Sequence, residues 1–367
     1  MAGFADSVQT WDTYELAAFQ RDDRAAPPDS FWMQWFAQPF FSEKKTIVFD
    51  DLPVRDRRMA PFVMPHAQAR IMAAPGPVGL KDFEPAYVKP AHHIDPSMTI
   101  PRMPGEALGG SISRQERFDR ITADRIVRQR DMIERRWDWM AAQALIKGSV
   151  LVQGEDYMPV TLNFNRDPSL TFILTGSGQW GETGVSPIAT IIAARTAAYE
   201  LGESPINDVV CGTEAAGLFL KDPALKEMND LRYLPQYSGG PSQFAGRPDF
   251  NLTGFGTGSP VEQFGAYGLP DGGTVRFWKY KNSYRDPYTG AMVDLLDPKE
   301  VVGIGGAVGG VRCFGAIENF EAGLAATDMF QSMWIEKNPS RAFVATESAP
   351  LMVPTNPNNT FRIRVRA

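Results

Sequence analysis

The chain has 367 residues, of which 43% are hydrophobic and 22% are charged, and its formal net charge is -6. That length allows a sizeable core and predicts one large domain or two to three smaller ones. The acidic balance argues against a dedicated nucleic-acid-binding protein, because such proteins usually carry a basic surface.

Targeting and redox signals are sparse. There is no run of about 18 or more apolar residues, so no membrane-spanning helix is expected. The first residues lack a basic segment followed by an apolar one, so we expect no secretory signal and a chain kept in a cytosol. Cys211 and Cys313 lie in apolar runs and are too few for a disulfide framework or a zinc site. We expect two buried, reduced thiols.

Residues 1–45 are predicted to form an arm. Short amphipathic pieces are interrupted by Pro27 and Pro28. A segment this short cannot bury its rings against itself, so it should lie on a larger body, either its own or a neighbour's. The aromatic residues in question are Trp32, Trp35, Phe36, Phe40 and Phe41.

Residues 46–112 are predicted to form an extended two-stranded ribbon. Thr46 to Phe49 is a strand candidate, and prolines recur from Pro61 to Pro104. Proline removes a ladder donor, so these strands should not lie inside a sheet. Because such a ribbon is marginal alone, we expect Tyr87 to Glu106 to contact its own core little. Its deletion should leave a folded chain that cannot assemble.

The strongest local signal is a helix of 34 residues that begins after Ser113. Ser113 and Glu116 form a capping box, Gly148 stands where a C′ glycine belongs, and no Pro or Gly intervenes. Such a rod is about 50 Å long. Opposite charges four residues apart should pair along it: Glu116 with Arg120, Asp124 with Arg128, and Asp131 with Arg135.

The apolar stripe of this helix is narrow at first and broad from Trp137 to Leu145. This gradient favours a rod that is buried on one side and laid along a surface on the other. A coiled coil is the weaker alternative, because no seven-residue repeat is kept.

The second half of the chain predicts a mixed α/β domain. A β-hairpin is expected at 150–164, a helix at 187–202, a strand at 208–211 and a helix at 213–230 that can break at Pro223. Residues 235–273 are a long loop rich in glycine, which is typical of a functional or mobile element. Further strands are expected at 274–280, 291–296, 301–304, 311–317, 341–346, 350–353 and 361–366.

The last of these strands alternates apolar residues with arginines. One apolar and one charged face suit a sheet edge or a surface between subunits.

No motif predicts chemistry. Val302 to Gly310 looks like a dinucleotide loop, but Val308 replaces the third glycine and no acidic partner follows at the required distance. A glycine-rich strand and turn is the better interpretation. The three histidines, His66, His92 and His93, all lie in the ribbon, where nothing fixes a catalytic base or completes a metal site. We therefore expect no catalytic residue, no metal and no cofactor.

The ribbon from Pro85 to Glu106 resembles the extended loop of the lambda-type phage major capsid proteins, the capsid protein E family. Three further stretches are similar to that family in the same order. They are Leu145 to Gly148 running through Gly154-Glu155 into Pro159-Val160, Val311 to Ile317, and Glu347 to Met352. The region 235–273 departs from the family pattern and resembles a lineage-specific elaboration.

The resemblance implies an α+β protein with the Hong Kong 97-type capsid fold. The implied divisions are an N-terminal arm (1–45), a strand of the P domain (46–65), the E-loop (66–112), the P domain (113–186) with its spine helix (113–147), an axial A domain (187–320) with the glycine-rich insertion (235–273), and a C-terminal return to the P domain (321–367).

The resemblance also implies a shell of hexamers and pentamers, assembled in the host cytoplasm with scaffolding and portal proteins, and optionally a decoration protein. The mature virion would enclose double-stranded DNA by non-specific contact, with no membrane involved. The residues expected to contact neighbouring subunits are Trp32, Trp35, Phe36, Tyr87, Lys89, His92, Met98, Arg102 and Glu106.

Two alternatives stay open at this point. An encapsulin-like cellular compartment would share the fold but package an enzyme in place of DNA. An enzyme of mixed α/β class would require polar residues clustered around one pocket.

Overall fold

The structure is a computed structural model that describes residues 30–44, 46–51, 79–101, 112–154, 158–223, 225, 260–269 and 273–366. At 48–51 and 79–82 only the backbone is described. The predictions for most of the arm, for His66, Arg102 and Glu106, and for most of the glycine-rich insertion lie outside these residues.

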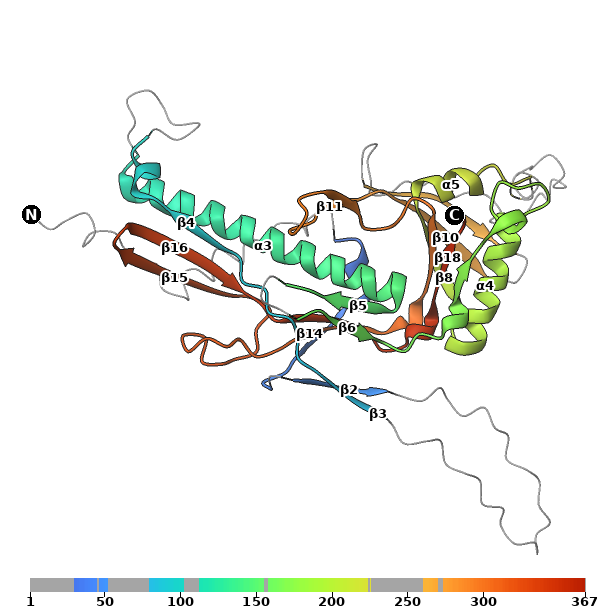
Figure 1. Ribbon diagram of the computed structural model, residues 1–367, viewed down its shortest axis with the longest axis horizontal. Helices are drawn as coiled ribbons and strands as arrows, with labels where there is room; N and C mark the ends of the chain where they lie inside the picture. Colours follow the sequence, from blue (N-terminus) through green and yellow to red (C-terminus); the bar gives the residue numbers. More distant parts are fainter. Residues whose placement is uncertain are drawn as a thin grey trace, which may run out of the picture.

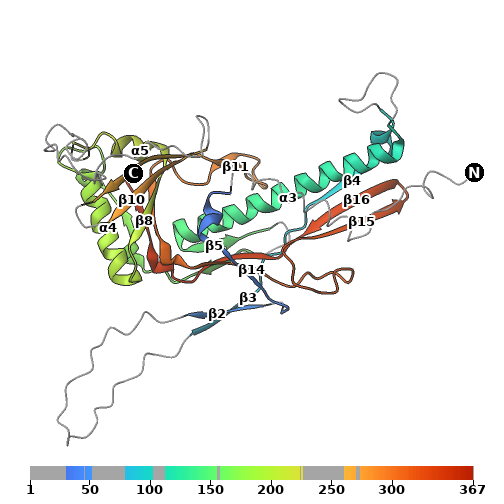
Figure 2. The same ribbon diagram turned by 180° about the vertical axis from the view of Figure 1, so that it is seen from behind.

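The described chain is elongated, with a rod at one end and a sheet-based body at the other (Figure 1). The rod is helix α3, Arg114–Lys147, along which the three-stranded sheet of β4, β15 and β16 lies. A six-stranded sheet with α4 and α5 forms the other end, and the ribbon of β2 and β3 projects from the middle (Figures 1 and 2).

Helix α3 begins and ends where the sequence predicts. The Ser113 side chain accepts a hydrogen bond from the Glu116 N–H at 3.1 Å, and Gly148 takes the left-handed conformation at φ 67°. Two of the three expected ion pairs form, from Arg120 to Glu116 at 2.8 Å and from Arg128 to Asp124 at 2.9 Å. The Asp131–Arg135 pair stays a prediction. Burial broadens towards the C-terminus of the helix, as expected.

The C-terminus of α3 is held by Arg166. Its guanidinium Nη1 donates to the carbonyl oxygens of Leu145 at 3.1 Å and Ile146 at 2.9 Å, and its Nη2 donates to Thr171 Oγ1 at 3.1 Å. Burial, and then the nearby charge of Arg362, lower the pKa of Arg166 to about 10, so it stays charged at neutral pH. A cation suits the negative end of a helix dipole. Because Thr171 begins strand β7, this one side chain ties the rod to the six-stranded sheet.

The six-stranded sheet has the order β7-β18-β13-β8-β10-β9. Its strands are β7 Thr171–Ile173, β8 Ile206–Cys211, β9 Val261–Gly268, β10 Thr274–Tyr280, β13 Glu300–Gly305 and β18 Thr360–Arg364. Helices α4, Pro187–Gly202, and α5, Thr213–Phe219, cover it. Phe219 stacks on Phe277 at 4.6 Å within this second core. Helix α5 ends at Phe219 and helical conformation returns at Pro223 and Leu225, so the helix predicted at 213–230 is interrupted just before Pro223.

Two expectations for this sheet are wrong. Strand β18 lies between β7 and β13, so it is not a sheet edge, and Arg362 on its arginine face pairs with the buried Glu300 of β13. A contact of this face with another subunit stays a prediction. The return of residues 321–367 to the P domain stays a prediction; β18 pairs there with β7, within the range 113–186 assigned to that domain. The predicted loop 235–273 is also not loop throughout, since its residues 261–268 form β9.

Smaller sheets surround the rod. Strands β1, β14 and β17 form one, β15, β16 and β4 form another, and β2–β3, β5–β6 and β11–β12 are two-stranded. The hairpin predicted at 150–164 is confirmed as β5–β6. The bounds are β1 Gln38–Phe41, β2 Ile47–Asp51, β3 Gly79–Phe83, β4 Ala91–Ile94, β5 Ser149–Val152, β6 Val160–Asn163, β11 Ser283–Arg285, β12 Met292–Asp294, β14 Gly310–Phe314, β15 Phe330–Lys337, β16 Ser340–Glu347 and β17 Pro350–Pro354. Short 3-10 helices lie at Trp32–Trp35, Pro96–Thr99, Pro168–Leu170, Gly176–Gly178, Gly306–Val308 and Pro357–Asn359.

The two-stranded ribbon predicted within 46–112 is confirmed at β2 and β3, which pair with each other and project from the body. The expectation that Tyr87 to Glu106 contacts its own core little is wrong in the part that the structure describes. Strand β4, by contrast, pairs with β16, and Ile94 is 1% exposed in a cluster with Phe118 and Val344. The described part of 87–106 is therefore anchored to its own subunit, because β4 pairs with a strand near the far end of the chain and buries Ile94. Its deletion should unfold the rod region.

Candidate intersubunit surfaces

The N-terminal aromatic residues fill a core under the rod. Trp32 and Phe36 have no exposed surface, and the Trp32 ring lies 5.2 Å from that of Tyr280. The Trp32 N–H donates to Asp138 Oδ1 of α3 at 2.8 Å. Trp32 and Phe36 are therefore not contacts to neighbours, because the subunit buries them itself. Trp35 is half-buried and stays a candidate contact.

Strand β1, which follows this cluster, has one edge that no described strand covers. It pairs with β14 on one side, and all four of its residues are exposed. Phe40 and Phe41 are 50% and 48% exposed. Hydrophobic side chains on an unpaired strand edge are typical of a surface that another chain covers. Sequence reasoning placed both residues in the arm but did not select them, because burial of their neighbours could not be seen.

The tip of the β15–β16 hairpin is a second exposed apolar surface. Trp334 and Ile335 are 40% and 39% exposed, and Trp334 stacks on Phe343 at 5.4 Å. Trp334 and Phe343 lie on one face of this sheet, whereas Ile335 shares the other face with Val344, which packs on α3. One face is thus used within the subunit, and the other is available to a neighbour.

A buried carboxylate holds the base of β4. Glu347, whose side chain is 1% exposed, accepts from Lys89 Nζ at 2.7 Å, from Asn319 Nδ2 at 3.1 Å and from the Tyr87 hydroxyl. Burial favours a raised pKa for Glu347, but the hydrogen bonds from Lys89, Tyr87 and Asn319 outweigh burial and lower it. Burial and the bond to Glu347 raise the pKa of Tyr87. Tyr87 and Lys89, expected to contact neighbours, therefore bind their own subunit.

We predict that Glu347→Gln lowers the free energy of unfolding by about 1.5–3 kcal/mol, the usual contribution of hydrogen bonds to a charged group. Half of Lys89 is exposed, so solvent screens its part of the effect. Glu336→Gln, at an exposed position on the neighbouring strand β15, is the control and should change stability by less than about 0.5 kcal/mol. Urea unfolding of the unassembled chain measures both free energies. Equal losses of stability in the two variants would contradict a stabilising role for the hydrogen bonds of Glu347.

His92 belongs to a second internal network. The Gln129 Nε2 lies 3.0 Å from His92 Nδ1 and donates to the Val344 carbonyl at 2.8 Å, while Thr346 Oγ1 donates to Gln129 Oε1 at 2.7 Å. Burial, and then the charges of Arg125 and Arg128, lower the pKa of His92. His92 is thus held in a polar network of its own subunit. Met98, half-buried in the 3-10 helix after β4, stays a candidate contact.

This network predicts a pH dependence. A histidine whose pKa is lowered by folding binds its proton more readily in the unfolded chain, so stability falls as pH drops below about 6.5. The loss continues down to the folded pKa and then levels off. We expect the natural chain to lose more stability than His92→Asn between pH 7.5 and 5.5, as measured by urea unfolding. Parallel pH profiles would show that His92 does not contribute.

The described residues contain neither a metal-binding group nor a membrane-spanning helix. Within them, no group of three or more His, Cys, Asp or Glu side chains could hold a metal ion, and no helix is long and apolar enough to cross a membrane. Both cysteines are buried and free, as predicted, and burial raises the pKa of Cys313 to about 12 and that of Cys211 further. The glycine run at 302–310 is a strand, a short turn and a strand, as predicted.

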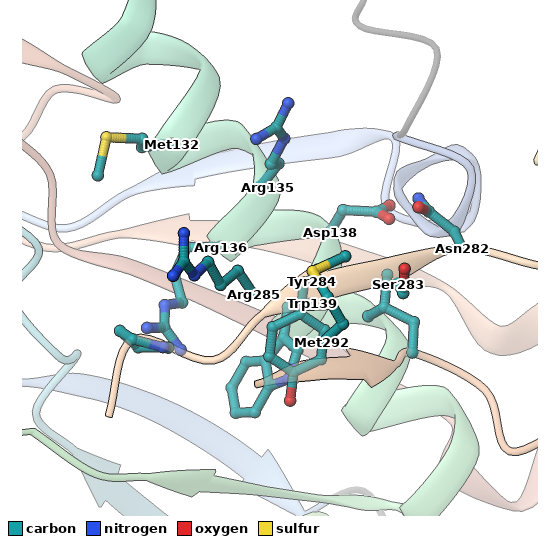
Figure 3. A pocket seen from close by; sticks show the side chains of 12 residues that line it. Met132, Arg135, Arg136, Asp138, Trp139, Asn282, Ser283, Tyr284, Arg285 and Met292 are labelled. Atoms are coloured by element: carbon teal, nitrogen blue, oxygen red, sulfur yellow. The ribbon is translucent and has the colours of Figure 1, made fainter. Parts of the chain in front are cut away.

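A hollow of about 540 Å³, with charged and apolar lining residues, lies between α3 and the β11–β12 hairpin (Figure 3). Helix residues at i, i+3, i+4, i+6 and i+7 form one wall, and residues in and around the hairpin form the other. Trp139 packs edge-on to Tyr284 at 6.4 Å, and Arg136 lies over the Trp139 ring at 5.1 Å. The lining residues are Met132, Arg135, Arg136, Asp138, Trp139, Asn282, Ser283, Tyr284, Arg285, Pro287, Met292 and Leu295.

A capped rod, a projecting ribbon and open apolar strand edges define a structural subunit whose surfaces suit contact with copies of itself. Comparison with known proteins agrees. The family model for phage major capsid protein E matches residues 35–365, so the chain belongs to that family.

The sequence is 24% identical over 315 residues to the major capsid protein of Escherichia phage lambda, covering 84% of this chain and 85% of that protein. It is 25% identical over 326 residues to the major capsid protein of Escherichia phage N15, with the same coverage. A crystal structure of a prophage capsid protein from E. coli CFT073 superposes with a TM-score of 0.71 at 22% identity, covering 97% of this chain and 99% of that one. The predicted α+β, Hong Kong 97-type capsid fold is confirmed, and the chain is a structural capsid protein of tailed phages.

Proposed function

We propose that the chain assembles as hexamers and pentamers into the icosahedral head of a tailed phage, working with scaffolding and portal proteins in the host cytoplasm and enclosing double-stranded DNA. The observation that carries the proposal is the open edge of β1, where Phe40 and Phe41 are half-exposed. A second copy that covers this edge would bury both rings and satisfy the free strand groups. The ribbon of β2 and β3 projects from the body and supports the same reading.

A cellular cargo compartment with the same fold ranks behind a phage head. The matching family and the curated relatives at 24–25% identity are phage capsid proteins. DNA contact without sequence specificity agrees with the acidic net charge, since only local basic surfaces need to face the polyanion.

Expression with its co-encoded head proteins, followed by size-exclusion chromatography and negative-stain imaging, tests the proposal. We expect closed shells of one major chain for the natural sequence. The double variant Phe40→Ser, Phe41→Ser should stay folded but form no shells, because both positions are exposed in the single subunit. Tyr199→Ser, at a 56% exposed site on α4, is a matched control for loss of an exposed ring. A natural chain that stays monomeric at high concentration with every head protein present would refute the proposal.

A further inference from the structure

The hollow beside α3 is basic and partly apolar. Its lining carries three arginines and one aspartate, a formal charge of +2. Arg135 and Arg136 project from the helix and Arg285 from the hairpin around the same space (Figure 3). Met132 and Met292 are 51% and 67% exposed on its rim. Guanidinium groups above exposed methionines and aromatic rings suit an acidic peptide that also carries large apolar side chains.

Nearby carboxylates are directed elsewhere. Asp138 accepts from the Trp32 N–H at 2.8 Å. Asp286, in the hairpin turn, accepts from the Tyr288 N–H at 3.0 Å and from the Thr289 hydroxyl at 2.8 Å. These bonds lower the pKa of Asp286, and so does the charge of Arg136 in the lining, so Asp286 offsets part of the positive charge. Three lining arginines against Asp138 and Asp286 still leave a positive balance that an acidic ligand would complement.

The N-terminal segment of the chain has the matching composition. Residues 1–20 contain Asp6, Asp12 and Glu15 but no lysine or arginine, so their side chains carry a charge of -3. The same segment supplies large apolar side chains at short spacing. These are Phe4, Val8, Trp11, Tyr14, Leu16 and Phe19.

The described chain also begins beside the hollow. Ser30 is its first residue, Phe31 packs against Tyr280 at 5.5 Å, and Trp32 bonds to the lining residue Asp138. The ten residues 20–29 can span about 35 Å when extended and about 18 Å on average as a flexible chain. Along α3, Met132 and Asp138 are only about 9 Å apart. The acidic segment is thus tethered within reach, at an effective concentration of about a millimolar.

We propose that residues 4–19 of the chain's own arm dock in this arginine-lined hollow between α3 and the β11–β12 hairpin. The acidic side chains pair with Arg135 and Arg285, and the aromatic and aliphatic side chains cover Met132, Met292 and Trp139. The hollow is then an internal binding site for the arm of the same subunit.

A disulfide trap tests the docking. Leu16→Cys with Met292→Cys places thiols on the arm and on the rim, in a chain whose own two cysteines are buried. Under mild oxidation we expect an intrachain disulfide about tenfold faster than in the control pair Leu16→Cys with Tyr199→Cys, since docking raises the local thiol concentration. Peptide mass analysis identifies the bond. Equal rates in the two pairs would overturn the proposal.

Charge variants separate docking from mere tethering. Arg135→Glu with Arg285→Glu should slow the trap about tenfold, whereas Arg128→Glu, on the same helix outside the hollow, should not. Adding Asp12→Arg and Glu15→Arg to the first pair should restore the rate. Circular dichroism checks that each variant folds. A trap rate that does not respond to these charges would contradict the inference.

Mixing two single-cysteine chains, one with Leu16→Cys and one with Met292→Cys, tests which arm docks. We expect little interchain bond below the assembly concentration. Interchain bonding as fast as the intrachain reaction would assign the hollow to a neighbour's arm and overturn the proposal.

Discussion

Trp32→Ala is expected to lower the free energy of unfolding by about 3–5 kcal/mol, the usual cost of truncating a fully buried tryptophan. The ring has no exposed surface and lies among Phe31, Trp35 and Tyr280, beside the rod. Its loss leaves a cavity that rigid aromatic neighbours cannot close. Urea unfolding of the unassembled chain, followed by circular dichroism, measures the effect without relying on tryptophan fluorescence.

Phe40→Ala is the control for Trp32→Ala, because it removes a neighbouring aromatic ring that is 50% exposed on β1. It should change the stability of the single subunit by less than about 1 kcal/mol. The two variants thus divide the arm into a part that folds the subunit and a part that meets a neighbour. Similar losses for both would show that this division is misplaced.

Gly212→Ala is expected to cost about 3 kcal/mol or more, because the added methyl has no space. A Cβ there would lie 2.4 Å from the carbonyl oxygen of Asp297 and 2.6 Å from that of Pro298. The Pro298 carbonyl accepts from the Glu214 and Ala215 N–H groups at 3.0 Å, so this backbone cannot retreat without breaking the start of α5. Thermal unfolding and expression of soluble chain measure the loss.

Gly217→Ala is expected to change the stability in the opposite direction, within the helix that Gly212 precedes. Gly217 is exposed within α5, and a Cβ there meets no atom within 4 Å. Alanine should therefore stabilise the chain by up to about 1 kcal/mol through helix propensity alone. If both alanines act alike, steric crowding at Gly212 is not the cause.

The sequence predicted correctly those parts of the fold that depend on residues close together in the chain. Both ends of α3 followed from Ser113, Glu116 and Gly148, because capping uses atoms only a few residues apart. The hairpin at 150–164 and the helix at 187–202 were found for the same reason.

The predictions that were wrong concern residues whose partners lie far away in the sequence. Strand β4 looked like an unsupported ribbon because its partner β16 lies near the other end of the chain. Strand β18 was expected at a sheet edge because the sequence does not show that β7 and β13 flank it, nor that Glu300 lies beside Arg362. For the same reason Trp32 and Phe36 were assigned to neighbours, although α3 and β10 of their own subunit cover them.

The candidate surfaces were predicted less well than the fold. The open edge of β1 requires knowing that β14 takes only one side of it. To predict the arginine-lined hollow, one would need to know that the face of α3 with Arg135 and Trp139 packs opposite a hairpin about 150 residues later in the chain. Spacing on the helix could have indicated this face, but not what lies opposite it.

The hydrogen bonds from Arg166 to the last carbonyls of α3 couple the orientation of the helix to that of the six-stranded sheet. One end of the helix is fixed to β7 of the six-stranded sheet, and the other end carries β4, β15 and β16. For a stiff rod of about 50 Å, a rotation of the sheet by about 5° sweeps the far end through about 4 Å. That displacement is close to the spacing of paired strands, about 4.8 Å. A rotation of about 5° at one end of the subunit would thus move the other end by nearly one strand spacing.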